Sequence, residues 1–212
     1  DNLFMRMSDE DWDTVILDET DVVRLEAEHD FSPTSRVEMA ALLNARLCDL
    51  DDLLVGDTSP RELWAIITQE RVLRKSLAGE LKNLARGAYL VNQEAVTGDE
   101  KETDIRLAST KEPLEAVIEL KIGENGYSFT DLQQALHTQL AGKYMAPEHR
   151  RVGCLLISIS GDRHWLDPVT KTRMEFEEVV SRLDIEAKEL AANLGYGAHL
   201  VAKGLDLRPR KA

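Results

Sequence analysis

The stretch Glu115-Ala116-Val117-Ile118-Glu119-Leu120-Lys121 has the pattern of a β-strand in the interior of a fold. Side chains alternate between the two faces of a strand, and one face of this one is wholly apolar: Ala116, Ile118 and Leu120. Glu119 and Lys121 share the other face with Val117. Charged side chains in so apolar a strand are costly unless they have partners or a chemical role. We therefore expect a functional site on this strand.

A second short strand lies just upstream, in the run Thr103-Asp104-Ile105-Arg106-Leu107, and it supplies a further carboxylate. Two carboxylates and one lysine on neighbouring strands suit a divalent metal that assists the cleavage of a phosphodiester. The sequence thus predicts a catalytic set of Asp104, Glu119 and Lys121. The alternative interpretation is a surface ion pair between Glu119 and Lys121 on an exposed strand face.

The rest of the chain alternates between helical and strand periodicity. Helices are expected over 36–55, 130–144 and 175–194, and a long one from the start signal Ser59-Pro60-Arg61-Glu62 to about Arg86-Gly87. Strands are expected over 89–96, 103–109, 114–120, 152–160 and 199–202. This order predicts an α/β fold with a central mixed sheet flanked by helices. We expect residues 1–58 to form an acidic helical extension or linker, and residues 59–212 to form the catalytic domain.

This order of elements, with Asp104 on the second strand and Glu119-Leu120-Lys121 on the third, resembles the PD-(D/E)XK nuclease superfamily, which has the restriction-endonuclease-like fold. Thr103 stands where the family usually has proline. The resemblance spans residues from about 60 to 203. It implies that Asp104, Glu119 and the Leu120 carbonyl hold Mg²⁺ or Mn²⁺. It also implies that Lys121 orients or deprotonates the attacking water, or stabilises developing negative charge.

Many members of this family place a further metal-binding glutamate on the helix before the first strand. Glu80 is the expected counterpart, because it lies beside Leu77, Leu81 and Leu84 at the edge of the apolar stripe. Glu70 lies closer to the centre of the stripe but further from the strands, and Glu94 also competes. A solvated helix glutamate is the alternative for Glu80.

The helix after the third strand carries Gln139 and Tyr144, which resemble the Q-x-x-x-Y element of the RecB-like branch, with the tyrosine one residue late. We expect Gln139 to contact a ligand water or a phosphate and Tyr144 to lie in the core. Lys143, Arg150 and Arg151 form a basic cluster that is expected to meet the phosphates of DNA. Solvated cations near a helix end are the alternative for these three residues.

The charge of the chain is unevenly distributed. The net charge is −13, and residues 1–58 hold 16 acidic and 4 basic side chains, so the remainder is nearly balanced. Charge alone does not argue for DNA. No apolar run approaches the ~20 residues that a membrane helix needs. Cys48 and Cys154 lie far apart in the sequence, which fits a reducing cytoplasm and argues against a structural zinc site.

These observations predict a metal-dependent endonuclease domain that acts on DNA. The resemblance and the first residue, Asp1, point to the effector part of a larger bacterial restriction or anti-phage defence protein with other domains. A homo-oligomer is a further expectation. Two alternatives from other classes remain: a catalytically silent nuclease-like scaffold, and an oligomerisation module in which residues 1–86 have the main role.

Overall fold

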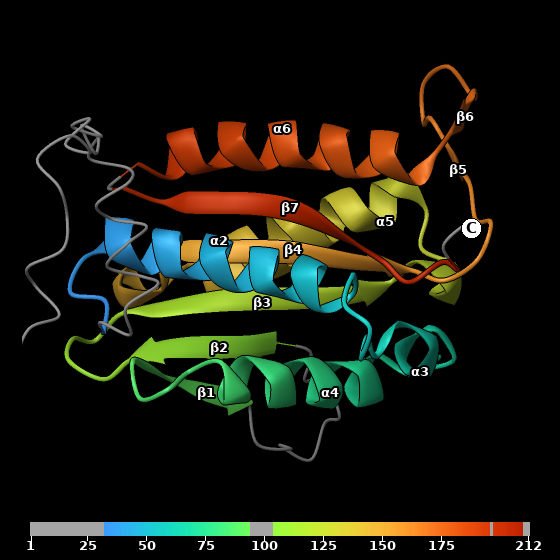
Figure 1. Ribbon diagram of the computed structural model, residues 1–212. Helices are drawn as coiled ribbons and strands as arrows, with labels where there is room; N and C mark the ends of the chain where they lie inside the picture. Colours follow the sequence, from blue (N-terminus) through green and yellow to red (C-terminus); the bar gives the residue numbers. More distant parts are fainter. Residues whose placement is uncertain (1–31, 94–103, 196, 210–212) are drawn as a thin grey trace, which may run out of the picture.

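A mixed five-stranded sheet lies at the centre of the computed structural model, which describes residues 32–93, 104–195 and 197–209 (Figure 1). Its strands lie in the order β1 (Tyr89–Gln93), β2 (Asp104–Ser109), β3 (Glu115–Ile122), β4 (Val152–Ile159) and β7 (His199–Asp206). The first three are antiparallel neighbours, whereas β3, β4 and β7 run parallel. The carboxyl ends of three strands therefore meet at one edge of the sheet.

Helices cover both faces of this sheet (Figure 1). One face carries α2 (Arg36–Leu53) and α4 (Glu70–Asn83), with the short α3 (Arg61–Ala65) between them in the chain. The other carries α5 (Phe129–Gln134), the π-type helix η2 (Ala135–Tyr144) and α6 (Phe176–Leu194). Short 3-10 turns follow β3 (η1, Gly123–Asn125) and precede β4 (η3, Glu148–Arg150). The expected mixed α/β architecture is confirmed.

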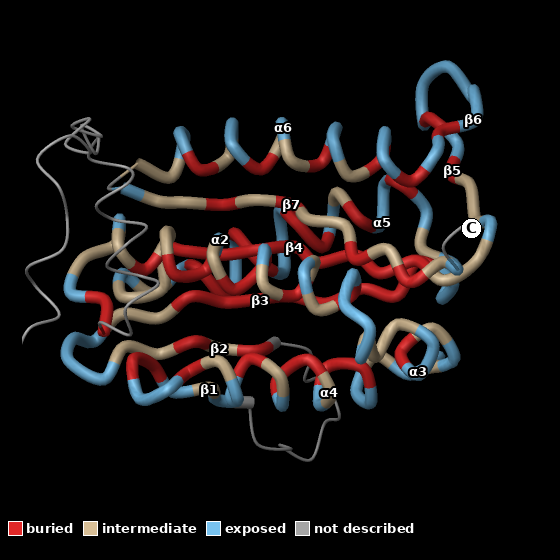
Figure 2. Tube along the Cα trace, viewed as in Figure 1, coloured by how far each residue is buried: buried red, intermediate tan, exposed pale blue. Residues whose placement is uncertain are grey.

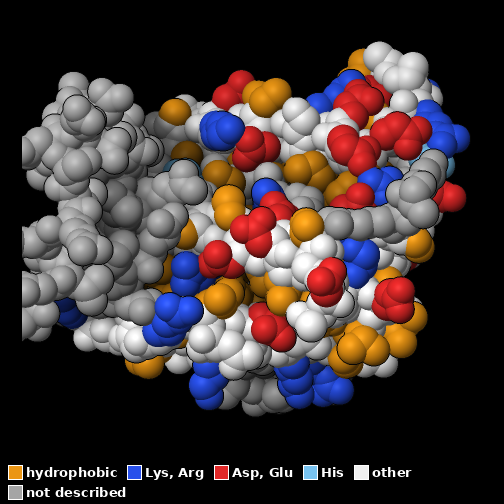
Figure 3. Space-filling model, in the orientation of Figure 1, with side chains coloured by type: hydrophobic (Ala, Val, Ile, Leu, Met, Phe, Trp, Pro, Cys, Tyr) orange, Lys and Arg blue, Asp and Glu red, His pale blue; other side chains and the backbone are white. Residues whose placement is uncertain are grey.

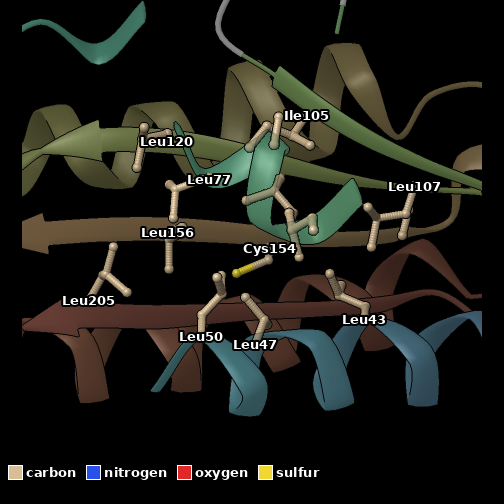
Figure 4. Close-up of a cluster of buried hydrophobic side chains, with 14 of the residues drawn as sticks. Leu43, Leu47, Leu50, Leu77, Ile105, Leu107, Leu120, Cys154, Leu156 and Leu205 are labelled. Carbon is tan, nitrogen blue, oxygen red and sulfur yellow. The ribbon is translucent and has the colours of Figure 1, made fainter. Parts of the chain in front are cut away.

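Each face of the sheet has its own hydrophobic core. Beneath α2 and α4, leucines of the helices pack on Ile105, Ile118, Leu120 and Leu156 (Figure 4). Beneath α5, η2 and α6 the core includes Val117, Leu155 and Ile157. β3 and β4 are buried along almost their whole length (Figure 2). Both faces of β3 are thus covered, and its apolar face points into the first core as expected.

The helix expected from Ser59 to Gly87 is interrupted. α3 ends at Ala65 and α4 begins at Glu70, with the run Ile66-Ile67-Thr68 between them. Three β-branched residues in succession lose side-chain freedom in a helix, which favours a break there. The expected capping box is also absent: Ser59 Oγ accepts a hydrogen bond from the Arg61 amide, but α3 has no side-chain cap.

Other boundaries differ by smaller amounts. β7 extends to Asp206, four residues beyond the expected end. A small hairpin of β5 (Trp165–Leu166) and β6 (Arg173–Met174) was not expected from the sequence. The expected strand residues beyond Gln93, including Glu94, lie outside the described residues.

α2 belongs to the main fold, although it falls within the segment 1–58. Its buried residues Leu42, Leu43, Leu47 and Leu50 share one core with α4 and the sheet. Residue 58 therefore does not separate two cores, and residues 1–31 lie outside the described part of the chain. None of the described helices combines the length and apolar character needed to cross a membrane.

Candidate active site

Glu119 and Lys121 form a buried ion pair on β3. Their side chains are 0% and 6% exposed, and Lys121 Nζ lies 2.7 Å from Glu119 Oε1. Both therefore lie on the same face of the strand, as its alternation predicts. The alternative of an exposed surface ion pair does not describe this geometry, because the helices of that face cover the pair.

The register of the sheet sets Asp104 opposite Glu119. The two residues are direct partners across the antiparallel β2–β3 pair. Residues directly opposite one another occupy the same face of a sheet. The described backbone thus brings position 104 beside Glu119 and Lys121, the arrangement expected for the catalytic set.

The surroundings favour the charged form of Lys121. Burial is the largest single effect and opposes this charge, but the carboxylate of Glu119, which also accepts a hydrogen bond, acts together with Glu70 and Tyr127 to raise the pKa of Lys121. Glu70 adds a smaller effect in the same direction. A buried lysine normally loses its proton more easily, so here the neighbouring carboxylates decide its state.

Glu70 lies at the carboxyl end of β3, in the first turn of α4. Its Oε1 accepts hydrogen bonds from the Ile122 amide at 3.2 Å and from Asn125 Nδ2 at 3.4 Å. It also makes a side-chain hydrogen bond with Tyr127. The break between α3 and α4 produces this placement, because it starts a helix beside the end of the strand.

Tyr127 extends the cluster on the outer side of Lys121. The ammonium lies 5.3 Å from the centroid of its ring, within the range of a cation–π contact. Burial, together with the negative charge of Glu70, raises the pKa of the Tyr127 hydroxyl above its ordinary value. The phenol is therefore protonated at neutral pH.

A pocket of about 400 Å³ opens beside Lys121 and Tyr127. Its other lining residues come from the turn after β3 and from the helix that follows: Asn125, Gly126, Asp131, Gln134, Ala135 and Gln139. Glu119 lies behind Lys121, with no exposed surface. The pocket thus gives solvent access to the lysine, and the glutamate lies one layer deeper.

The π-type turns of η2 position Gln139. In this helix the Met145 amide bonds to the Leu140 carbonyl, five residues back, which is the π-helical pattern. Gln139 is exposed and lines the pocket, whereas Tyr144 is buried in the core, as expected. Of the two residues that resemble the Q-x-x-x-Y element, Gln139 therefore lies at the pocket and Tyr144 lies in the interior.

The structure does not bring Glu80 to this cluster. Glu80 lies ten residues beyond Glu70 on α4, which corresponds to roughly 15 Å along the helix axis. The helix runs away from the carboxyl end of β3, and Leu81 contacts Tyr89 at the start of β1. Glu70 is the glutamate of α4 that reaches the site.

The basic residues also lie apart from the pocket. Arg150 pairs with Glu115 at the amino end of β3, six positions before Lys121, or roughly 20 Å along the strand. Arg151 precedes β4 at that same end, and the Lys143 ammonium lies 4.9 Å from the ring centroid of Tyr144. On the face that carries α2 and α4, acidic and basic side chains are interspersed (Figure 3).

The donors at this site suit a hard divalent cation, since carboxylate oxygens are the ligands that Mg²⁺ prefers. Glu119 provides one buried carboxylate, Asp104 is its register partner, and the expected carbonyl belongs to Leu120 between Glu119 and Lys121. Among the residues whose side chains the structure describes, no three of His, Cys, Asp and Glu gather closely enough to hold a metal. A metal here therefore depends on Asp104 as the partner of Glu119.

The sequence does not indicate several residues of the site. No sequence pattern distinguishes Asn125, Tyr127 or Gln134, and Glu70 is expected only as an alternative to Glu80. The helix-breaking run before Glu70 was the available signal for its position. Tyr127 follows a turn at Gly126, which has φ +88°, and nothing in the sequence indicates that its ring faces Lys121.

Comparison with known proteins gave no match to a family model, a curated protein or a solved structure.

Proposed function

We propose that this chain is a metal-dependent nuclease domain that hydrolyses DNA phosphodiester bonds. The observation that carries the proposal is the buried Glu119–Lys121 pair beside a pocket, with Asp104 opposite Glu119 in the sheet register. The placement of the site supports it as well, because ligands of open α/β sheets bind outside the carboxyl ends of parallel strands.

Each residue would have a separate role in such a reaction. Asp104, Glu119 and the Leu120 carbonyl would hold Mg²⁺ or Mn²⁺, which supplies an activated water and neutralises charge on the phosphate. Lys121 has three N–H donors, and one of them contacts Glu119. The others are available to orient the water or to stabilise negative charge that develops on a phosphate oxygen. Gln139 lies at the pocket that the substrate would enter.

A catalytically silent scaffold is the second candidate function. One observation favours it: the Lys121 ammonium already forms an ion pair with the Glu119 carboxylate. A buried pair of this kind is compatible with a purely structural role. The proposed oligomerisation module has less support, because α2 and α4 within residues 1–86 pack on the sheet.

Incubation of supercoiled plasmid with the protein in Mg²⁺, in Mn²⁺ and in EDTA tests the proposal. The nuclease should nick DNA only with metal, and Glu119→Gln should abolish nicking because it removes a charge that the metal needs. Glu115→Gln is the matched control, since Glu115 lies on the same strand but pairs with Arg150 at its other end.

Two results would overturn the proposal. One is equal nicking by wild-type protein and Glu119→Gln, which would place the activity elsewhere. The other is the absence of nicking by folded wild-type protein on both single-stranded and duplex DNA, which would favour the scaffold.

A further inference from the structure

The pocket beside Lys121 combines three kinds of side chain. Tyr127 contributes an aromatic ring, and Lys121 contributes an ammonium group at the inner end. Carboxamides come from two sides of the pocket: Asn125, Gln134 and Gln139. A ligand that contacts the ring, the carboxamides and the ammonium together would have a flat aromatic face, hydrogen-bonding edges and a negatively charged group.

A nucleotide has these features. Bases stack on aromatic side chains, and carboxamides pair with their donor and acceptor edges. A lysine meets the phosphate. In a duplex, however, the faces of a base are stacked and its pairing edge is occupied, so a concave pocket receives only an unpaired or extruded base.

The turn that carries Tyr127 is held rigidly by the loop after β4. The Tyr127 carbonyl accepts hydrogen bonds from Arg163 Nη2 at 2.7 Å and from Trp165 Nε1 at 2.9 Å. Glu124, earlier in the same turn, accepts bonds from the Ser160 and Gly161 amides at 2.7 and 2.8 Å. Preorganisation of this kind lowers the entropy lost on binding.

The remaining lining residues belong to the helix formed by α5 and η2. Gln134 and Gln139 are exposed there. Neither side chain forms a hydrogen bond with another residue in the described part of the chain. The one acidic lining residue, Asp131, caps α5: its Oδ2 accepts from the Ser128 amide at 2.8 Å and from the Ser128 hydroxyl at 2.6 Å. Its carboxylate is thus engaged at the rim, and Lys121 is the cation of the pocket.

We propose that this pocket seats one unpaired nucleotide of a DNA strand, with its base on Tyr127 and the carboxamides and its phosphate toward Lys121. The inference rests on the proposed nuclease function and names its substrate class: single-stranded DNA, or duplex DNA with unpaired bases. An intact duplex is a poorer ligand, because its bases do not reach the pocket.

Fluorescence anisotropy in EDTA tests this without any cleavage. The probes are a short labelled single strand of mixed sequence and the fully paired duplex of the same sequence. The single strand should bind at least about tenfold more tightly, and Tyr127→Leu should weaken its binding about tenfold, as expected for the loss of one base–aromatic stack. Tyr127→Phe keeps the ring and should bind nearly as well as the wild-type protein.

A second comparison uses exposed residues on the surface of η2, where substitution removes no buried contact. Gln139→Ala should weaken binding of the single strand, whereas Thr138→Ala, at an exposed neighbour that does not line the pocket, should not. Thermal unfolding of each variant checks that the fold is retained. If Tyr127→Leu is unfolded, the comparison of Gln139→Ala with Thr138→Ala tests by itself whether the pocket binds the single strand.

The inference is overturned if the duplex binds as tightly as the single strand, or if Gln139→Ala and Thr138→Ala behave alike. Equal losses in Tyr127→Phe and folded Tyr127→Leu would also overturn it, since the ring would then be irrelevant. Binding of the single strand without metal-dependent cleavage would contradict the nuclease proposal alone. Cleavage without a preference for unpaired DNA would contradict only this inference.

Discussion

The Lys121 ammonium lies 2.7 Å from the Glu119 carboxylate, and the Glu119 side chain has no exposed surface. Removing one member of a buried pair leaves an uncompensated charge, whereas removing both leaves none. The contribution of this pair to stability and its contribution to catalysis can therefore be measured separately.

The Lys121→Met variant should be strongly destabilised. It removes the ammonium that lies 2.7 Å from the buried Glu119 carboxylate, and breaking a buried ion pair typically costs about 3–5 kcal/mol of unfolding free energy. Adding Glu119→Gln should recover most of that loss. Denaturant unfolding at neutral pH measures both effects. As a control, Lys188→Met removes an exposed ion pair with Asp184 and should cost less than about 1 kcal/mol. Equal losses of unfolding free energy in Lys121→Met and Lys188→Met would contradict the expected effect of burial.

The pair should also show a characteristic dependence on pH. The pKa of Lys121 is raised above its ordinary 10.5, so its contribution is fully present below pH 10.5 and is lost as the pH rises through the folded-state value. The difference in unfolding free energy between the wild-type protein and the double variant Lys121→Met/Glu119→Gln, which carries neither charge, should therefore be constant through neutral pH and shrink only in strong alkali. A difference that shrinks already between pH 7 and pH 9 would contradict the raised pKa.

Glu70 and Glu80 lie on the same helix but in different surroundings, so they form a matched pair. Glu70→Ala removes an acceptor for the Ile122 amide, Asn125 and Tyr127, and should cost about 2 kcal/mol of stability. Glu80→Ala, at a half-buried position ten residues away, should change stability by no more than about 0.5 kcal/mol. Thermal or urea unfolding measures the difference, and a larger effect at Glu80 would refute the assignment of roles.

The sequence predicted the local features of this fold better than its tertiary contacts. Alternation in 115–121 correctly placed Ala116, Ile118 and Leu120 in a core and set Glu119 and Lys121 on one face. The sequence predicted that β3 has β2 as a neighbour, but it did not predict their exact register. The turn length sets the pairing of Asp104 with Glu119, and hydrophobic periodicity does not encode that length.

The misplaced helix boundary had a direct effect on the site. A continuous helix from Ser59 to Gly87 made Glu80 the natural glutamate near the strands. The break at Ile66-Ile67-Thr68 instead starts α4 at Glu70, beside the end of β3. Tyr127 could not be found from sequence, since its position depends on hydrogen bonds from Arg163 and Trp165, more than thirty residues later.

Titration of the protein with Mn²⁺ by isothermal calorimetry measures the proposed metal site itself, because it needs no DNA and no cleavage. Wild-type protein and Glu115→Gln should show saturable binding of Mn²⁺, and both Glu119→Gln and Asp104→Asn should lose it. Absence of binding in the wild-type protein, or unchanged binding in folded Glu119→Gln, would contradict the assignment of Glu119 and Asp104 as the metal site.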